Sequence, residues 1–114
     1  MCLTTFAYDF QMDGLYYTII SETELTVEVS YTEGAKYKDD VVIPKEVTKH
    51  RNTYKVVRIG REAFLNSEML SITIPESVDS ISYDAFQNCL RIQKIYVDEN
   101  NPKYKTENGV LFNK

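Results

Sequence analysis

The side chains that most often carry out chemistry are few in this chain of 114 residues. It has two cysteines, Cys2 and Cys89, and one histidine, His50. A zinc site draws on several closely spaced Cys and His ligands, and the sequence has no Cys-x-x-Cys or His-x-x-x-His pair. A nucleophilic cysteine needs a base, but His50 lies between Lys49 and Arg51, whose charges disfavour a protonated ring. The sequence therefore predicts no metal centre and no Cys–His catalytic pair.

Glycines and paired carboxylates give no stronger sign of catalysis. A phosphate-binding loop needs several glycines close together, whereas here they stand singly: Gly14, Gly34, Gly60 and Gly109. The pairs Asp39-Asp40 and Asp98-Glu99 lie in turn-like segments, where solvated surface charge is favoured over acid–base catalysis. We therefore expect a chain that is not an enzyme and binds no cofactor. A carboxylate-dependent hydrolase is the least favoured alternative.

The two cysteines leave three interpretations open. Cys89 fits a position in the core, because an unpaired cysteine behaves as a small apolar side chain. A disulfide between Cys2 and Cys89 would instead close almost the whole chain into one loop. Cys2 is also a candidate for the lipid modification that anchors many bacterial surface proteins.

Charge and composition narrow the class of protein. Thirteen basic and 17 acidic residues give a net charge of −4, so there is no electrostatic footprint for nucleic acid or an anionic membrane. No apolar run exceeds three residues, which excludes a membrane-spanning helix and a signal-peptide core in the sequence as given. Val, Ile and Thr total 29 residues against 11 for Ala and Leu, which predicts mostly strands.

The first third of the chain has the period-two pattern of strands. Apolar residues alternate from Phe6 to Met12, and Asp13-Gly14 then predicts a two-residue hairpin turn. A return strand over residues 15–20 and a third strand over 25–31 follow, and residues 32–40 have the character of a loop. We expect residues 1–40 to form an N-terminal antiparallel β cap with its loop.

The rest of the chain repeats a unit of 22–23 residues. Ile59-Gly-Arg-Glu-Ala-Phe64 recurs as Ile81-Ser-Tyr-Asp-Ala-Phe86, and Ile72-Thr-Ile-Pro75 corresponds to residues 95–98. The first unit carries an insertion around residues 49–53. Each unit has a short strand, a turn, a second apolar anchor and a single helical turn. One unit cannot bury its own apolar face, so its neighbours must stack on it.

These features predict a β-rich solenoid of the leucine-rich-repeat type, with about two and a half repeats over residues 41–114, continuous with the cap. Phe64 and Phe86 should be equivalent buried anchors. The residues expected to point inward are Ile72, Ile74, Val78, Ile81, Ala85, Phe86, Ile92, Ile95 and Val97. Cys89 should join them.

The unit resembles the repeat of the BspA-like leucine-rich-repeat family of bacterial surface proteins, approximately Ile-x-Ile-Pro-x-x-Val-x-x-Ile-Gly-x-x-Ala-Phe-x-x-Cys-x-x-Leu-x-x. Residues 72–92 carry the match. Residues 97–104, followed by residues 108–114, resemble another recurrent unit of that family. Residues 10–17 resemble the strand pair that often precedes its first repeat. Ser67 and Ser82 stand where the unit usually has Cys and Gly, which should alter local packing without removing the coil.

The resemblance implies an extracellular or cell-surface location and an adhesion or recognition role, toward a host or bacterial surface protein or a glycan. Family members are usually longer and carry a secretion signal, so we expect this sequence to be a trimmed piece or a short member. The alternative is a structural role, as a cap and spacer that presents other domains of a larger surface protein.

The candidate binding residues follow from the strand pattern. Val42, Thr73 and Tyr96 each lie between two inward apolar residues of successive strands, so they should form a ladder on one face. An exposed Tyr96 would give a rigid amphipathic contact of the kind enriched in binding hot spots. Its alternative role is ordinary packing against strand neighbours. The polar residues expected at the rim of this ladder are Lys94, Ser71 and Glu76.

The C-terminal end carries a further expectation. Residues 108–112 end the chain in apolar side chains where a following coil would stack, which predicts an open strand edge. Self-association, the N-terminal segment of a neighbour or further domain sequence would cover such an edge.

Overall fold

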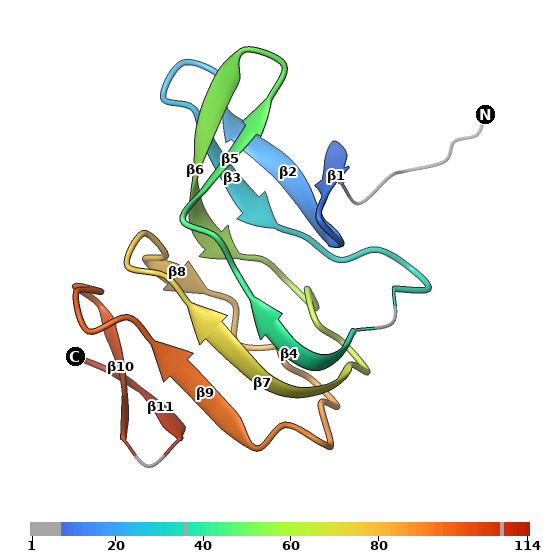
Figure 1. The fold of residues 1–114 in the computed structure, drawn as a ribbon, viewed down its shortest axis with the longest axis vertical. Coiled ribbons are helices and arrows are strands. Elements are labelled where there is room, and N and C mark those ends of the chain that lie inside the picture. Colours follow the sequence, from blue (N-terminus) through green and yellow to red (C-terminus); the bar gives the residue numbers. More distant parts are fainter. Residues whose placement is uncertain (1–7, 36, 108) are drawn as a thin grey trace.

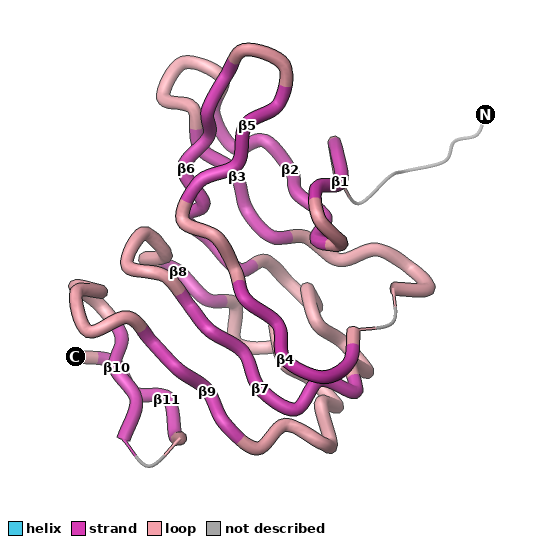
Figure 2. The backbone as a smooth tube through the Cα atoms, in the orientation of Figure 1, coloured by secondary structure: helices cyan, strands magenta, loops and turns pink. Residues whose placement is uncertain are grey.

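The computed structural model of the protein describes residues 8–35, 37–107 and 109–114. These residues form eleven strands joined by turns, with no helix among them (Figures 1 and 2). The strands are β1 (Phe10–Met12), β2 (Leu15–Ser21), β3 (Thr26–Val29), β4 (Lys38–Val42), β5 (Glu46–Lys49), β6 (Asn52–Ile59), β7 (Glu68–Ile74), β8 (Ser80–Ile81), β9 (Lys94–Val97), β10 (Tyr104–Glu107) and β11 (Val110–Asn113).

Two parallel arrays of three strands form the centre of the fold. β3, β6 and β8 make one array, and β4, β7 and β9 make the other (Figure 1). The paired residues are those that the sequence repeat relates: Ile59 lies opposite Ile81, and Ile72 lies opposite Ile95. Each strand of one unit therefore lies beside the matching strand of the next, which is the leucine-rich-repeat arrangement.

The predicted N-terminal antiparallel strands are present. Asp13 and Gly14 turn between β1 and β2 with φ of 50° and 87°, the left-handed conformations that a two-residue hairpin requires. β3 pairs with β2 on one edge and, in parallel, with β6 on the other, so these strands run directly into the first array. Phe6, the predicted beginning of the hairpin, lies outside the described residues.

The apolar core includes the inward side chains of both arrays. Val56 and Ile59 of β6 and Ile72 and Ile74 of β7 have no exposed surface. Of the predicted inward residues, four are fully buried: Ile72, Ile74, Val78 and Ala85. The remaining five are partly buried and pack against the same core: Ile81, Phe86, Ile92, Ile95 and Val97.

The predicted equivalence of Phe64 and Phe86 is wrong in burial, although their positions match. Their rings stack with centroids 5.8 Å apart and an interplanar angle of 5°. Phe64 is fully buried, and Tyr37 packs edge-on against it with a centroid distance of 5.0 Å. Phe86 is only partly buried, although it packs against the same core.

The predicted single helical turns are instead series of tight turns. They contain hydrogen bonds between residues three apart, such as Ala63 N–H to the Gly60 carbonyl at 3.3 Å. Left-handed residues interrupt them: φ is 53° at Glu62, 59° at Asn66 and 61° at Asn88. Because a right-handed helix cannot continue through such residues, the chain reverses without forming one.

Two further segments differ from the sequence prediction. Residues 38–40, predicted as the end of a loop, begin β4, because β7 supplies hydrogen-bonding partners for a stretch of poor strand formers. The insertion at 49–53 lies within the antiparallel β5–β6 hairpin, which turns at His50 with φ of 58°. In both places a partner strand determines the structure.

The C-terminal residues form a hairpin of their own. β11 pairs with β10 along four residues, from Glu107–Val110 to Tyr104–Asn113, and both strands lie near β9. The apolar residues predicted to end as an open coil edge therefore have a pairing partner on one side. Val110 and Phe112 remain exposed, and whether they mediate self-association stays a prediction.

Asn101 fastens this hairpin to the preceding unit. Its fully buried side chain donates from Nδ2 to the carbonyls of Pro75, at 2.9 Å, and Val78, at 2.8 Å. Its Oδ1 accepts from the backbone N–H groups of Lys103 and Tyr104, each at 2.8 Å. One side chain thus satisfies four backbone groups from two separate segments.

The burial of the stacked rings gives a first prediction. Phe64→Ala should lower the free energy of unfolding by about 3–5 kcal/mol, the usual cost of removing a buried phenylalanine ring. Phe86→Ala should cost about half as much, because part of that ring already faces water. Urea unfolding of both variants checks this, and equal losses would contradict the unequal burial.

Asn101 gives a second prediction. Asn101→Ala should cost about 2–4 kcal/mol, because it leaves buried backbone groups without partners. The exposed neighbour supplies a matched control: Asn100→Ala should be nearly neutral. Urea unfolding compares the two variants, and similar stability would show that Asn101 does not fasten the hairpin.

Candidate functional site

The predicted ladder lies in register on the outer face of β4, β7 and β9. Val42 lies opposite Thr73, and Thr73 lies opposite Tyr96. Val42 is 63% exposed and Tyr96 is 47% exposed, with Thr73 half-buried between them. The residues on either side in each strand face the core, so this row is free to contact something outside the molecule.

A second, polar row runs beside the ladder. Asp40 lies opposite Ser71, and Ser71 lies opposite Lys94, in the same register. The Ser71 hydroxyl donates to Asp40 Oδ1 at 2.6 Å, which fixes the carboxylate against β7. Lys94 is exposed as predicted, whereas Ser71 is buried and cannot serve as an open rim residue. We call these two rows the Tyr96 face: Val42, Thr73, Tyr96, Asp40, Ser71 and Lys94.

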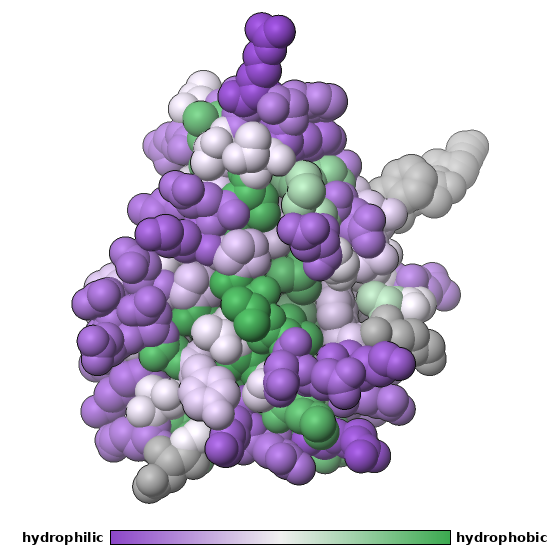
Figure 3. Space-filling model, in the orientation of Figure 1, coloured by the Kyte–Doolittle hydropathy of each residue, from purple (hydrophilic) through white to green (hydrophobic). Residues whose placement is uncertain are grey.

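Shallow hollows flank Tyr96. One has a volume of about 410 Å³ and is lined by Asp40, Leu70, Ser71, Thr73, Gln93, Lys94 and Tyr96. The other has a volume of about 510 Å³ and is lined by Gln93, Lys94, Ile95, Tyr96, Thr106 and Gly109. Figure 3 shows hydrophobic residues gathered in the middle of the side on which β4 and β7 lie, with hydrophilic residues around them. The chemistry available here is contact by an aromatic ring within a polar surround.

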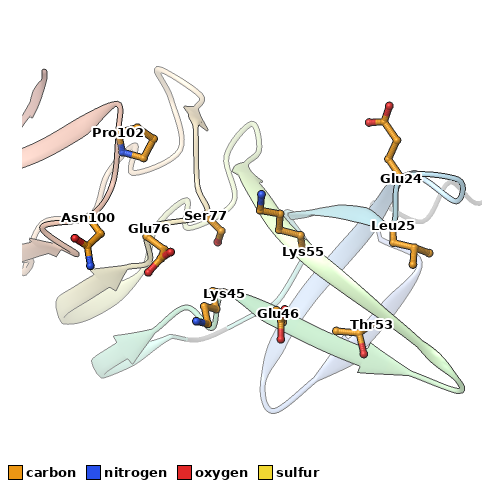
Figure 4. Close-up of a pocket in the computed structure, with 10 residues that line it drawn as sticks. All are labelled: Glu24, Leu25, Lys45, Glu46, Thr53, Lys55, Glu76, Ser77, Asn100 and Pro102. Atoms are coloured by element: carbon orange, nitrogen blue, oxygen red, sulfur yellow. The ribbon is translucent and has the colours of Figure 1, made fainter.

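Glu76, predicted at the rim, lies elsewhere. It follows the end of β7 and lines a separate groove of about 600 Å³ with Lys45, Lys55 and Ser77 (Figure 4). Glu24 borders the same groove but points away from the other labelled side chains. The prediction placed Glu76 on the strand face because it ignored the turn that begins at Pro75.

Sequence reasoning missed Asp40, which belongs to the face, and Gln93, which lines both hollows beside it. Asp40 had a usable signal, since it lies two positions before Val42 and therefore on the same side of an extended strand. Assigning residues 32–40 to a loop concealed it. Gln93 precedes β9, and its backbone N–H donates to the Leu70 carbonyl at 2.8 Å, a contact that no local pattern predicts.

In the described part of the chain, Cys89 and His50 lie in different surroundings. The Cys89 thiol is buried and donates to the Phe64 carbonyl at 3.0 Å, and burial raises its pKa. Cys89 is therefore the core cysteine that the sequence predicts, while Cys2 lies outside the described residues. His50 is exposed at its turn.

A hydrogen bond from the Ser82 hydroxyl, at 2.6 Å, is the main cause that lowers the pKa of Asp84. Within the described ranges, no group of three or more His, Cys, Asp or Glu side chains could hold a metal ion. The same ranges contain no helix long and apolar enough to cross a bilayer.

A known family matches most of the repeat region. Residues 38–109 match the family described as "BspA type Leucine rich repeat region (6 copies)". That range begins with β4 and reaches the turn before β11, so it covers the whole β4–β7–β9 array. No curated protein matches the chain at a significant level.

Solved structures of bacterial leucine-rich-repeat proteins share the fold. A Bacteroides capillosus protein has 28% identity and a TM-score of 0.69. The match covers 80% of this chain and 66% of that protein. A Faecalibacterium prausnitzii protein described as a leucine rich cell surface protein has 25% identity and a TM-score of 0.67. The match covers 87% of this chain and 25% of that protein. A Eubacterium ventriosum protein has 34% identity and a TM-score of 0.56. The match covers 67% of this chain and 18% of that protein.

The chain thus spans a quarter or less of two of these relatives and about two thirds of the third. The match over residues 38–109 covers more than half of the chain and includes most strands of the two parallel arrays. The chain belongs to the BspA-type leucine-rich-repeat family.

Proposed function

We propose that this chain is a non-catalytic protein-binding module of an extracellular or cell-surface protein, and that its Tyr96 face contacts the partner. The observation that carries the proposal is the exposed Tyr96 ring, held in register with Val42 and Thr73 on three adjacent strands. Tyrosine is enriched among residues that dominate binding energy, and it immobilises few rotatable bonds when it binds.

A protein partner fits the shape and chemistry of the face. The two hollows beside Tyr96 are shallow, so the surface suits a broad contact better than an enclosed small molecule. Apolar and aromatic side chains in the middle, with Asp40 and Lys94 at the side, match the usual anatomy of a protein interface. The description of the Faecalibacterium prausnitzii relative as a cell surface protein supports the location.

Tyr96→Ala gives the test of this proposal. The labelled chain is applied to an array of extracellular matrix proteins and bacterial surface proteins. The substitution should weaken the strongest interaction by about tenfold or more, as removal of a hot-spot aromatic does. Its melting temperature should stay within a few degrees, because the ring is half exposed.

Tyr83→Ala is the matched control. Tyr83 is 95% exposed and lies outside the Tyr96 face, so its removal should leave binding unchanged. Equal effects of the two substitutions on binding would contradict the proposal that the Tyr96 face contacts the partner. Binding that is absent for the unmodified chain would favour the spacer role.

We also propose that the repeats stack as a solenoid whose first unit is covered by the N-terminal strands. The supporting contacts come from Phe10, Leu15 and Tyr17, which are buried in the same core as the repeat residues. Phe10 stacks on Tyr17 with centroids 5.4 Å apart and also contacts Tyr54 of β6. Without these strands the apolar layer of the first unit would meet water.

Deletion of residues 1–31 tests the covering role. The remaining chain keeps β4 and every later strand but loses β3, the hydrogen-bonding neighbour of β6. It should be insoluble or unfolded, as judged by circular dichroism and thermal melting. A soluble fragment with a cooperative transition would contradict the proposal.

A further inference from the structure

The other parallel array has an outer face of a different character. Glu28 lies opposite Arg58, and Arg58 lies opposite Ser80, on β3, β6 and β8. Their neighbours Val29, Ile59 and Ile81 belong to or pack against the core, so the polar row faces outward. A groove of about 540 Å³ runs over this row. We call it the Glu28–Arg58 groove, and its lining residues are Glu28, Ser30, Tyr31, Arg58, Gly60, Arg61, Ser80 and Ser82.

The Glu28 carboxylate is fixed in place yet remains accessible. Its Oε1 accepts from Arg58 Nη1 at 3.1 Å, and its Oε2 accepts from the Ser30 hydroxyl at 3.2 Å. The Ser30 hydroxyl lies 2.6 Å from the Thr18 hydroxyl, which extends the network to β2. The side chains of Glu28 and Arg58 are 22% and 46% exposed. Each charged group therefore has a defined orientation and hydrogen-bonding capacity that faces the groove.

Gly60 leaves room for this arrangement. A Cβ at this position would lie 2.6 Å from Glu28 Oε2 and 3.1 Å from the Val29 carbonyl oxygen. Any side chain there would displace the carboxylate. The matching position of the next unit is Ser82, whose hydroxyl-bearing side chain also lines the groove.

A second pair of charges lies at the end of the groove. Arg61 Nε lies 3.5 Å from Asp84 Oδ2, and Asp84 Oδ1 accepts from the Ser82 hydroxyl at 2.6 Å. Two guanidinium groups and two carboxylates leave this surface electrically balanced. A strongly charged ligand would gain little net attraction there, because each charge already has an opposite neighbour.

We propose that the Glu28–Arg58 groove binds a neutral sugar unit of a glycan. Vicinal hydroxyl groups are both donors and acceptors, and they match a carboxylate and a guanidinium held side by side. The hydroxyls of Ser80 and Ser82 add short-range donors and acceptors, and the half-buried Tyr31 ring offers apolar surface for sugar C–H groups. This site is separate from the Tyr96 face and does not rest on the function proposed for that face.

An array of neutral oligosaccharides, from one to six sugar units, tests the proposal, and titration calorimetry quantifies each sugar that binds. At least one neutral oligosaccharide should bind, and Arg58→Ala should weaken it about tenfold or more, because charge-assisted hydrogen bonds are lost. Gly60→Ala should have a similar effect through the displaced carboxylate. Thermal melting of both variants shows whether they fold.

Two control variants show whether sugar binding is confined to the groove. Lys55→Ala removes an exposed cation of β6 that lies outside the groove, and Tyr96→Ala alters the other face; neither should change sugar binding. If Gly60→Ala fails to fold, Tyr31→Ala replaces it and should also weaken binding. The proposal is overturned if no neutral oligosaccharide binds. It is equally overturned if only anionic sugars or peptides bind, or if Arg58→Ala and Tyr31→Ala leave binding unchanged.

Discussion

The structure depends on one constraint: no repeat unit can bury its own apolar face. Each unit contributes one strand to each parallel array, and its inward side chains are covered only when the next unit pairs in register. Ile59 opposite Ile81 and Ile72 opposite Ile95 meet this condition. A slip of one residue would move the apolar side chains of a whole strand to the solvent side. The repeat spacing is therefore what allows the units to pair in register and bury a common core.

Polar side chains solve the problem that this packing creates at the turns. The chain must reverse several times in each unit, and reversal leaves backbone groups without strand partners. Asn66 and Asn88 adopt left-handed conformations at matching positions, and the side-chain amide of Asn88 donates to Asn66 Oδ1 at 2.5 Å. Asn101 performs a related task between the second unit and the hairpin. Ser67 stands where the family repeat usually has Cys. Its hydroxyl oxygen accepts from the Met69 N–H at 3.1 Å, so this buried hydroxyl has a hydrogen-bonding partner.

The outward-facing positions of the strands can vary in residue type, because core packing constrains them little. On one array they form an aromatic and aliphatic row beside a polar row. On the other array they form a balanced set of charges and hydroxyls around a glycine. The two outer faces of the molecule therefore differ in chemistry although the same core supports both. Phe86 of the second unit is only partly buried, and Val110 and Phe112 of the C-terminal hairpin are exposed.

The sequence alone established the repeat, the family and the order of residues across the strands. Those features follow from local spacing: period two decides which side chains share a face, and a 22–23-residue period decides which strands are neighbours. The alignment of Val42, Thr73 and Tyr96 was predictable for this reason. The buried position of Cys89 was predictable as well, from its place in the unit.

Other features depend on contacts between segments that no local pattern encodes. Residues 38–40 become strand because β7 offers its edge. The turns at 60–67 are non-helical because Glu62 and Asn66 are left-handed, and both residues are hydrogen-bonded to the next unit, at Asp84 and Asn88. Phe86 differs from Phe64 in burial although the two have the same sequence context. Glu28 and Arg58 are 30 positions apart and share no motif, yet parallel pairing of β3 with β6 brings them within 3.1 Å. Burial and the pairing of distant charges depend on which surfaces meet, and that is decided only when the whole chain packs.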